Sequence, residues 1–263
     1  MDRRDFIKIT GSSLACFALA ACGGSQPKDE GPDYADDEAM ATIAKGFKAR
    51  ADFLSSKDYT GSDADLKKAV QKEIDCDSPL KERQFEDSNL HELVLSYLNS
   101  LEKQLDVLNN YSSTSVDYYT AWQKVYDERS TLLKKMVDDY GLIVDDSCKE
   151  ALDQIVANGN NASKKADVET SLNAIVSGAT FDVTDGGYGY YEYTTVLENT
   201  SDYDFDSVSL VVALYDEDGV KDRELYAYTN NWKKGEKVKF DAGTADIETT
   251  NVKATVQYYT VSE

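Results

Sequence analysis

The chain has little of several residue types that common functions need. It contains one histidine, three prolines and four cysteines in 263 residues. A single histidine argues against histidine-based catalysis and against His-rich metal sites. The 28 basic residues are outnumbered by 49 acidic ones, giving a net charge of −21. This charge argues against a nucleic-acid partner, because phosphate binding needs a basic stripe.

Sequence motifs for catalysis and metal binding are also missing. The chain has no Gly-x-Ser-x-Gly motif, phosphate-binding loop, zinc-protease motif or paired-cysteine zinc spacing. Asp202, Asp204 and Asp206 imitate the first three ligands of a calcium loop. However, Ser207 and Ala213 stand where that loop needs Gly and Glu. We therefore expect no enzymatic activity, no cofactor and no metal, with the three aspartates as the calcium candidates.

The N-terminal residues resemble a twin-arginine export signal. The match is Arg3 and Arg4 followed by a spacer and Phe6-Ile7-Lys8, with Asp2 where Ser or Thr is usual. The apolar run that follows is too short for a spanning helix, which needs about 20 apolar residues. This resemblance implies that the segment is an export signal and not part of the fold.

A second signal follows directly. Leu19-Ala20-Ala21-Cys22 resembles a bacterial lipoprotein box, in which the peptidase cuts before the cysteine and the thiol carries a diacylglycerol. The alternative is a plain N-terminal membrane anchor. We expect residues 1–21 to be a signal peptide, residues 22–35 a tether, and Cys22 the lipid anchor on the outer face of a bacterial membrane.

Residues 36–177 have helical periodicity and predict a bundle. The clearest apolar seam is Val94, Leu98, Leu101, Leu105 and Leu108. A second seam runs over residues 119–140 and ends at Gly141, as expected of a helix C-terminus. Arg129 on this seam predicts either a snorkelling stem or a carboxylate partner. We expect a shorter helix to end near Gly159 and a last one to span residues 166–176.

Cys76 and Cys148 are the cysteines left once Cys16 is removed and Cys22 is acylated. An oxidising exterior permits them to pair, so they are the disulfide candidate. The alternative is two free thiols.

Residues 178–263 show alternation of period 2 in six segments separated by turn signals. In the last segment, the alternation places Tyr258 on the same face as Val256 and puts Tyr259 opposite. The whole chain therefore reads as α+β, with a helical bundle followed by an antiparallel immunoglobulin-like β-sandwich.

The strand region also resembles the FxLYD domain of bacterial and archaeal surface proteins. The matching segments are Val196-Leu197-Glu198-Asn199-Thr200, Val212-Ala213-Leu214-Tyr215-Asp216-Glu217-Asp218-Gly219 and Lys234-Gly235-Glu236. Val212 stands where the family has Phe, and Lys234 where it has Pro. The resemblance implies a structural or binding module and carries over no active-site residues.

Tyrosines are concentrated in this region. Tyr188 and Tyr190 follow a Gly-Gly turn, and Tyr226 and Tyr228 alternate with Leu225 and Ala227. Cross-strand packing on an outer face is one reading, and a recognition surface is the other. These four tyrosines are the candidate binding surface.

Together these observations predict a noncatalytic cell-envelope lipoprotein that serves as a surface interaction or scaffolding module. The alternative is an extracytoplasmic solute- or glycan-binding lipoprotein. The expected partners are the membrane, through the lipid on Cys22, and an envelope protein or glycan, with no nucleic acid.

Overall fold

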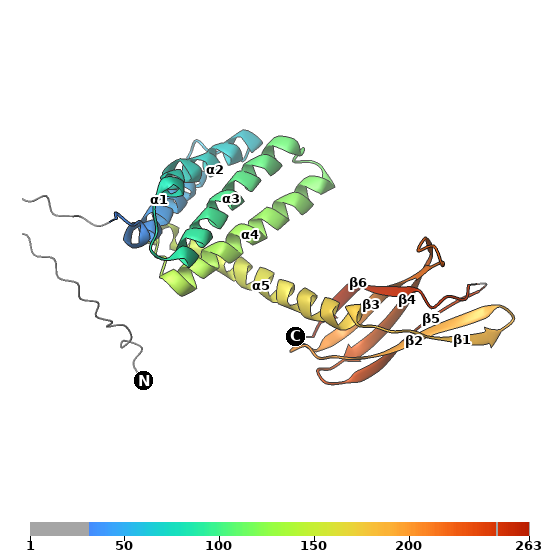
Figure 1. Cartoon of the computed structure of the whole chain (residues 1–263). Coiled ribbons are helices and arrows are strands. Elements are labelled where there is room, and N and C mark those ends of the chain that lie inside the picture. Colours follow the sequence, from blue (N-terminus) through green and yellow to red (C-terminus); the bar gives the residue numbers. More distant parts are fainter. Residues whose placement is uncertain (1–31, 246, 263) are drawn as a thin grey trace, which may run out of the picture. The chain divides into compact units, whose positions relative to one another are not determined.

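A computed structural model describes residues 32–245 and 247–262. These residues form five α-helices, two short 3-10 helices and six β-strands (Figure 1). The helices are α1 (Asp36–Leu54), α2 (Asp63–Asp77), η1 (Ser78–Glu82), α3 (Ser88–Asn110), α4 (Val116–Tyr140), η2 (Asp146–Cys148) and α5 (Lys149–Ser177). The strands are β1 (Asp182–Gly187), β2 (Tyr190–Glu198), β3 (Phe205–Tyr215), β4 (Lys221–Trp232), β5 (Lys237–Ala245) and β6 (Val252–Val261).

The α+β class is confirmed, because the helices precede two antiparallel sheets. The immunoglobulin-like assignment is finer than this observation. None of the helices in the described residues is long and apolar enough to cross a membrane.

The helical region is built around the apolar seam of α3. Val94, Leu98, Leu101 and Leu108 are buried there, and Leu105 packs partly against the same core. Each such side chain contributes about 1.5–3 kcal/mol when fully buried. Gly141 ends α4 in the left-handed conformation, with φ of 67°, as its position in the sequence predicts.

The prediction that a helix ends near Gly159 is wrong. Helix α5 runs without a break from Lys149 to Ser177, and Gly159 is buried inside it. A Cβ built on Gly159 would lie 2.5 Å from the backbone oxygen of Ser130 in α4. The glycine therefore allows two helices to approach closely and does not end one.

The strands form two three-stranded antiparallel sheets, with strand orders β1-β2-β5 and β4-β3-β6. Their buried side chains belong to a single hydrophobic cluster. Tyr193 and Phe240 come from the first sheet, and Phe205 and Trp232 from the second. The Trp232 and Phe240 rings meet edge to face, with centroids 5.4 Å apart. The two sheets thus share a core.

Helix α5 contributes to both cores. Leu152, near its start, is buried in the helical cluster. Val168, Leu172 and Val176, in its second half, are buried in the β cluster. One unbroken helix therefore packs in the helical core with its first half and in the β core with its second half.

Candidate functional site

Three predicted residues of the export and anchoring signals, Arg3, Arg4 and Cys22, lie outside the described residues. Two of the four candidate tyrosines, Tyr226 and Tyr228, lie on the β4-β3-β6 sheet. Tyr226 and Tyr228 are 56% and 74% exposed, on the face of β4 opposite the buried Leu225 and Ala227.

Tyr258 of β6 lies on the same outer face. Ser209 of β3 pairs with Tyr228 on one side and with Tyr258 on the other. Two strand spacings therefore separate the two tyrosines, or about 10 Å between Cα atoms. Val211 pairs with Tyr226 in the same way. We call Ser209, Val211, Tyr226, Tyr228 and Tyr258 the tyrosine face.

The sequence alternation placed Tyr258 on the wrong side of its strand. The β3–β6 register shifts between Ser209 and Leu210, which pair with Tyr258 and Val256 and leave Gln257 as the extra residue. A bulge of this kind moves every later side chain to the opposite face. Tyr258 is consequently 57% exposed, and Tyr259 packs against Phe205 with ring centroids 6.3 Å apart. No turn residue in the sequence signals this bulge.

Two hydroxyl groups of the tyrosine face are available for hydrogen bonds to a partner. The hydroxyls of Tyr226 and Tyr228 make no hydrogen bond to any residue that the structure describes. By contrast, Tyr258 accepts a hydrogen bond from Thr260 Oγ1 at 3.5 Å. The first two side chains therefore present an apolar ring and an unoccupied donor and acceptor.

Tyr188 and Tyr190 belong to the other sheet. Tyr188 lies at the β1–β2 turn with φ of 56° and is fully exposed. Tyr190 lies over Gly186 and Gly243, and a Cβ on Gly243 would be 1.7 Å from the Tyr190 hydroxyl. The glycines thus make room for the Tyr190 ring. The sequence grouped four tyrosines that the structure distributes over two sheets.

Each of the three calcium candidates already has a hydrogen-bond or ion-pair partner. Asp202 pairs with Lys234 Nζ at 2.6 Å, which lowers the pKa of that carboxyl. Asp204 accepts a hydrogen bond from the Lys234 amide, and Asp206 from the Ser262 hydroxyl. Within residues 32–245 and 247–262, no three His, Cys, Asp or Glu side chains gather into a group that could hold a metal ion.

Cys76 and Cys148, the cysteines in the described part of the chain, are both free. Cys148 is buried, and its thiol donates to the backbone oxygen of Asp145 at 3.3 Å. Burial raises the pKa of both thiols. The structure therefore has the alternative to the predicted disulfide, two free thiols.

Arg129 has the carboxylate partner that the sequence suggested. Its Nη2 lies 2.6 Å from Oε1 of Glu73, and Arg50 Nη1 lies 3.0 Å from Oε2. Tyr97 also donates its hydroxyl to Glu73. Burial would raise the pKa of Glu73, but the two guanidiniums and the Tyr97 hydroxyl hold it below its usual range. Glu73 is thus a buried anion shared by two cations.

A pocket of 270 Å³ opens beside these arginines. Its lining comes from α1, α4 and α5 and includes both Arg50 and Arg129. No sequence pattern signals this pocket, because its residues come from three different helices and α1 is far along the chain from α4 and α5.

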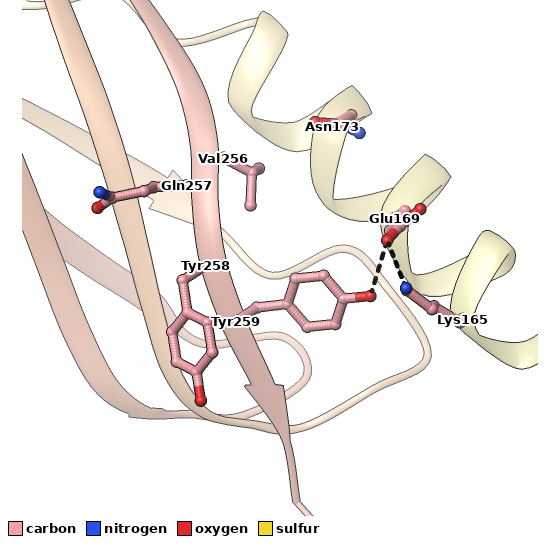
Figure 2. A pocket seen from close by; sticks show the side chains of 7 residues that line it. All are labelled: Lys165, Glu169, Asn173, Val256, Gln257, Tyr258 and Tyr259. Atoms are coloured by element: carbon pink, nitrogen blue, oxygen red, sulfur yellow. Dashed lines mark hydrogen bonds and ion pairs between the residues drawn. The ribbon is translucent and has the colours of Figure 1, made fainter. Parts of the chain in front are cut away.

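A second hollow, between α5 and β6, has a volume of 450 Å³. Figure 2 shows Tyr259 pointing toward Glu169 of the helix, while Tyr258 points away from it. The Tyr259 hydroxyl donates to Glu169 Oε1 at 3.4 Å, and Lys165 Nζ lies 3.9 Å from the same oxygen. These contacts join α5 to β6, so Lys165, Glu169 and Tyr259 of this hollow already bind one another.

Comparisons with known proteins give no family. No family model matches the chain, and no curated protein matches it. A similar solved structure is the alkylpurine DNA glycosylase AlkC of Pseudomonas fluorescens bound to DNA containing an abasic site analog. It is 10% identical, with 84% of this chain and 75% of that chain covered, and its TM-score is 0.21.

This finding corrects two expectations. We expected no enzymatic activity, and we excluded a nucleic-acid partner from the expected set of membrane, envelope protein or glycan. The matched structure is a DNA-bound enzyme, so neither exclusion is held any longer. At its TM-score of 0.21, the match assigns no activity and no partner to this chain.

Proposed function

We propose that the chain is an exported cell-envelope lipoprotein, anchored through Cys22 to the outer face of a bacterial membrane, and that its β region is a surface interaction module. The observation that carries the interaction role is the tyrosine face. Three tyrosines, each more than half exposed, lie on one side of one sheet. Clustered exposed aromatic rings are typical of protein interfaces.

We further infer that residues 178–263 form an immunoglobulin-like sandwich of the FxLYD type. Support comes from the residues that carry the resemblance. The buried Asn199 donates to the backbone oxygens of Tyr203 and Trp232 at 2.8 and 3.2 Å. Asp216 Oδ1 accepts from the Val220 amide at 2.8 Å, and Gly219 has φ of 79°. The matching segments thus form the turns that join strands of the shared core.

The partner that best fits this face is a protein with a basic rim. Tyrosine offers a large ring with a polar tip at low entropic cost. The net charge of −21 favours encounter with a positively charged surface.

The alternative, a solute- or glycan-binding lipoprotein, is favoured by a different observation. The pocket between α1, α4 and α5 has an apolar lining with two arginines.

Cross-linking on intact cells tests the interaction role. We compare wild type with Tyr226→Ser/Tyr228→Ser and with Tyr119→Ser, a control because Tyr119 of α4 is 65% exposed and lies outside the β region. Interface aromatic residues cost about 2 kcal/mol or more when truncated, so capture should fall about tenfold or more in the double variant only. Equal capture by a double variant with an unchanged melting temperature would contradict the proposal.

A further inference from the structure

The pocket between α1, α4 and α5 combines apolar walls with a cationic end. The apolar walls are Phe47, Ala51, Leu54, Ala151 and Ile155. Ser55 and Gln154, which are exposed, lie at its rim, whereas Arg50 and Arg129 are buried. Ligand pockets with mostly apolar walls and a few polar groups bind amphipathic small molecules.

Charge near the arginines is not balanced. Glu73 is the carboxylate that pairs with both guanidiniums. Asp77, the other buried acid of this cluster, has a pKa raised to about 9 by burial and by the nearby Glu73 carboxylate. It is therefore neutral at pH 7, which leaves two cations against one anion.

One donor of Arg129 also lacks an acceptor in the described part of the chain. Arg129 Nε, although buried, has no hydrogen-bond acceptor among the residues described. A buried donor without an acceptor is destabilising, and more so when it is charged. An anionic ligand beside the arginines would reduce the charge surplus.

We propose that this pocket binds a small carboxylate with an apolar tail. The carboxylate lies at the Arg50 and Arg129 end, where charge-assisted hydrogen bonds are strongest. The tail lies along Ala51, Leu54 and Ile155. The volume of 270 Å³ is just below the range of about 300–1,000 Å³ for drug-sized ligands, so the tail is short. The inference is independent of the lipid anchor and of the tyrosine face.

Isothermal titration calorimetry of the full chain tests the proposal. The protein carries Cys22→Ala, so that no acyl chain is attached, and the probes at pH 7 are octanoate and 1-octanol. These probes differ in the charged head and share the tail. Because hydrogen bonds to charged groups contribute about 1.5–3 kcal/mol, octanoate should bind about tenfold or more tightly than octanol.

Two tryptophan variants place the binding. Ala151→Trp fills the pocket from α5 without removing an arginine and should weaken octanoate binding about tenfold or more. Ala157→Trp is the matched control, because Ala157 is an exposed residue of the same helix outside the lining, and it should bind as wild type. The proposal is overturned if octanoate does not bind, if octanol binds equally well, or if folded Ala151→Trp binds octanoate as wild type does.

Discussion

Asp77 occupies an environment that its chemistry does not favour. It is fully buried, and neither of its carboxyl oxygens has a hydrogen-bond partner among the described residues. A Cβ on Gly46 would lie 2.2 Å from Asp77 Oδ1, so the glycine makes room for the carboxyl. Burial and the Glu73 carboxylate raise its pKa to about 9. At neutral pH the Asp77 carboxyl is therefore protonated in the folded state, and folding takes up one proton.

The pH dependence of stability should reveal this proton. Because the folded pKa is raised from 3.8 to about 9, the stability contributed by proton binding is complete below pH 4 and is lost as pH rises toward 9. We predict that the free energy of unfolding of Asp77→Asn, minus that of wild type, rises with pH over this window by up to about 1.4 kcal/mol per unit. Urea unfolding at several pH values measures it, and parallel curves would contradict the assignment.

Cys22 provides a second test on a single residue. Its position after Leu19-Ala20-Ala21 supports acylation of the thiol. We predict that wild type incorporates a palmitate analogue and fractionates with membranes, whereas Cys22→Ala does neither. Equal, poor labelling of two soluble proteins would rule out the anchor.

At the scale of the elements, the packing of α5 against α4 depends on one small residue. Gly159 permits the α4–α5 contact at Ser130. Gly159→Ala should destabilise the protein by about 1–2 kcal/mol, because overpacking outweighs the gain of about 1 kcal/mol in helix propensity. Gly178→Ala is the control, since the nearest atom to its added Cβ would be 3.7 Å away.

Thermal unfolding of both variants checks this prediction. The Gly159 variant should melt several degrees lower, by about 2–4 °C per kcal/mol for a chain of this size. The Gly178 variant should melt as wild type does. Equal melting temperatures would show that the α4–α5 contact adjusts without cost.

Sequence patterns predicted the elements better than their partners. Periodicity identified the α3 seam and the alternation of β4 because each depends on local spacing. It failed at Gly159, where the glycine makes a helix–helix contact and does not end a helix. It failed also at Tyr258, where a bulge moves the side chains to the opposite face of the strand. The position of Arg129 on an apolar seam suggested a carboxylate partner. It could not identify Glu73 as that partner, because the two residues belong to different helices. Contacts of this kind are set by tertiary packing.

In the whole molecule, α5 joins a helical core to a β core. The candidate pocket lies in the former region and the tyrosine face in the latter. The two proposals can therefore succeed or fail separately.

The central claim is that the tyrosine face contacts a protein partner at the cell surface. A photo-cross-linking amino acid in place of Tyr228 on intact cells tests it directly, with the same substitution at Tyr119 as the control. We predict a discrete protein adduct from position 228 that is absent at position 119 and lost when Tyr226→Ser is added. No adduct at position 228, or the same adduct from both positions, would contradict the account.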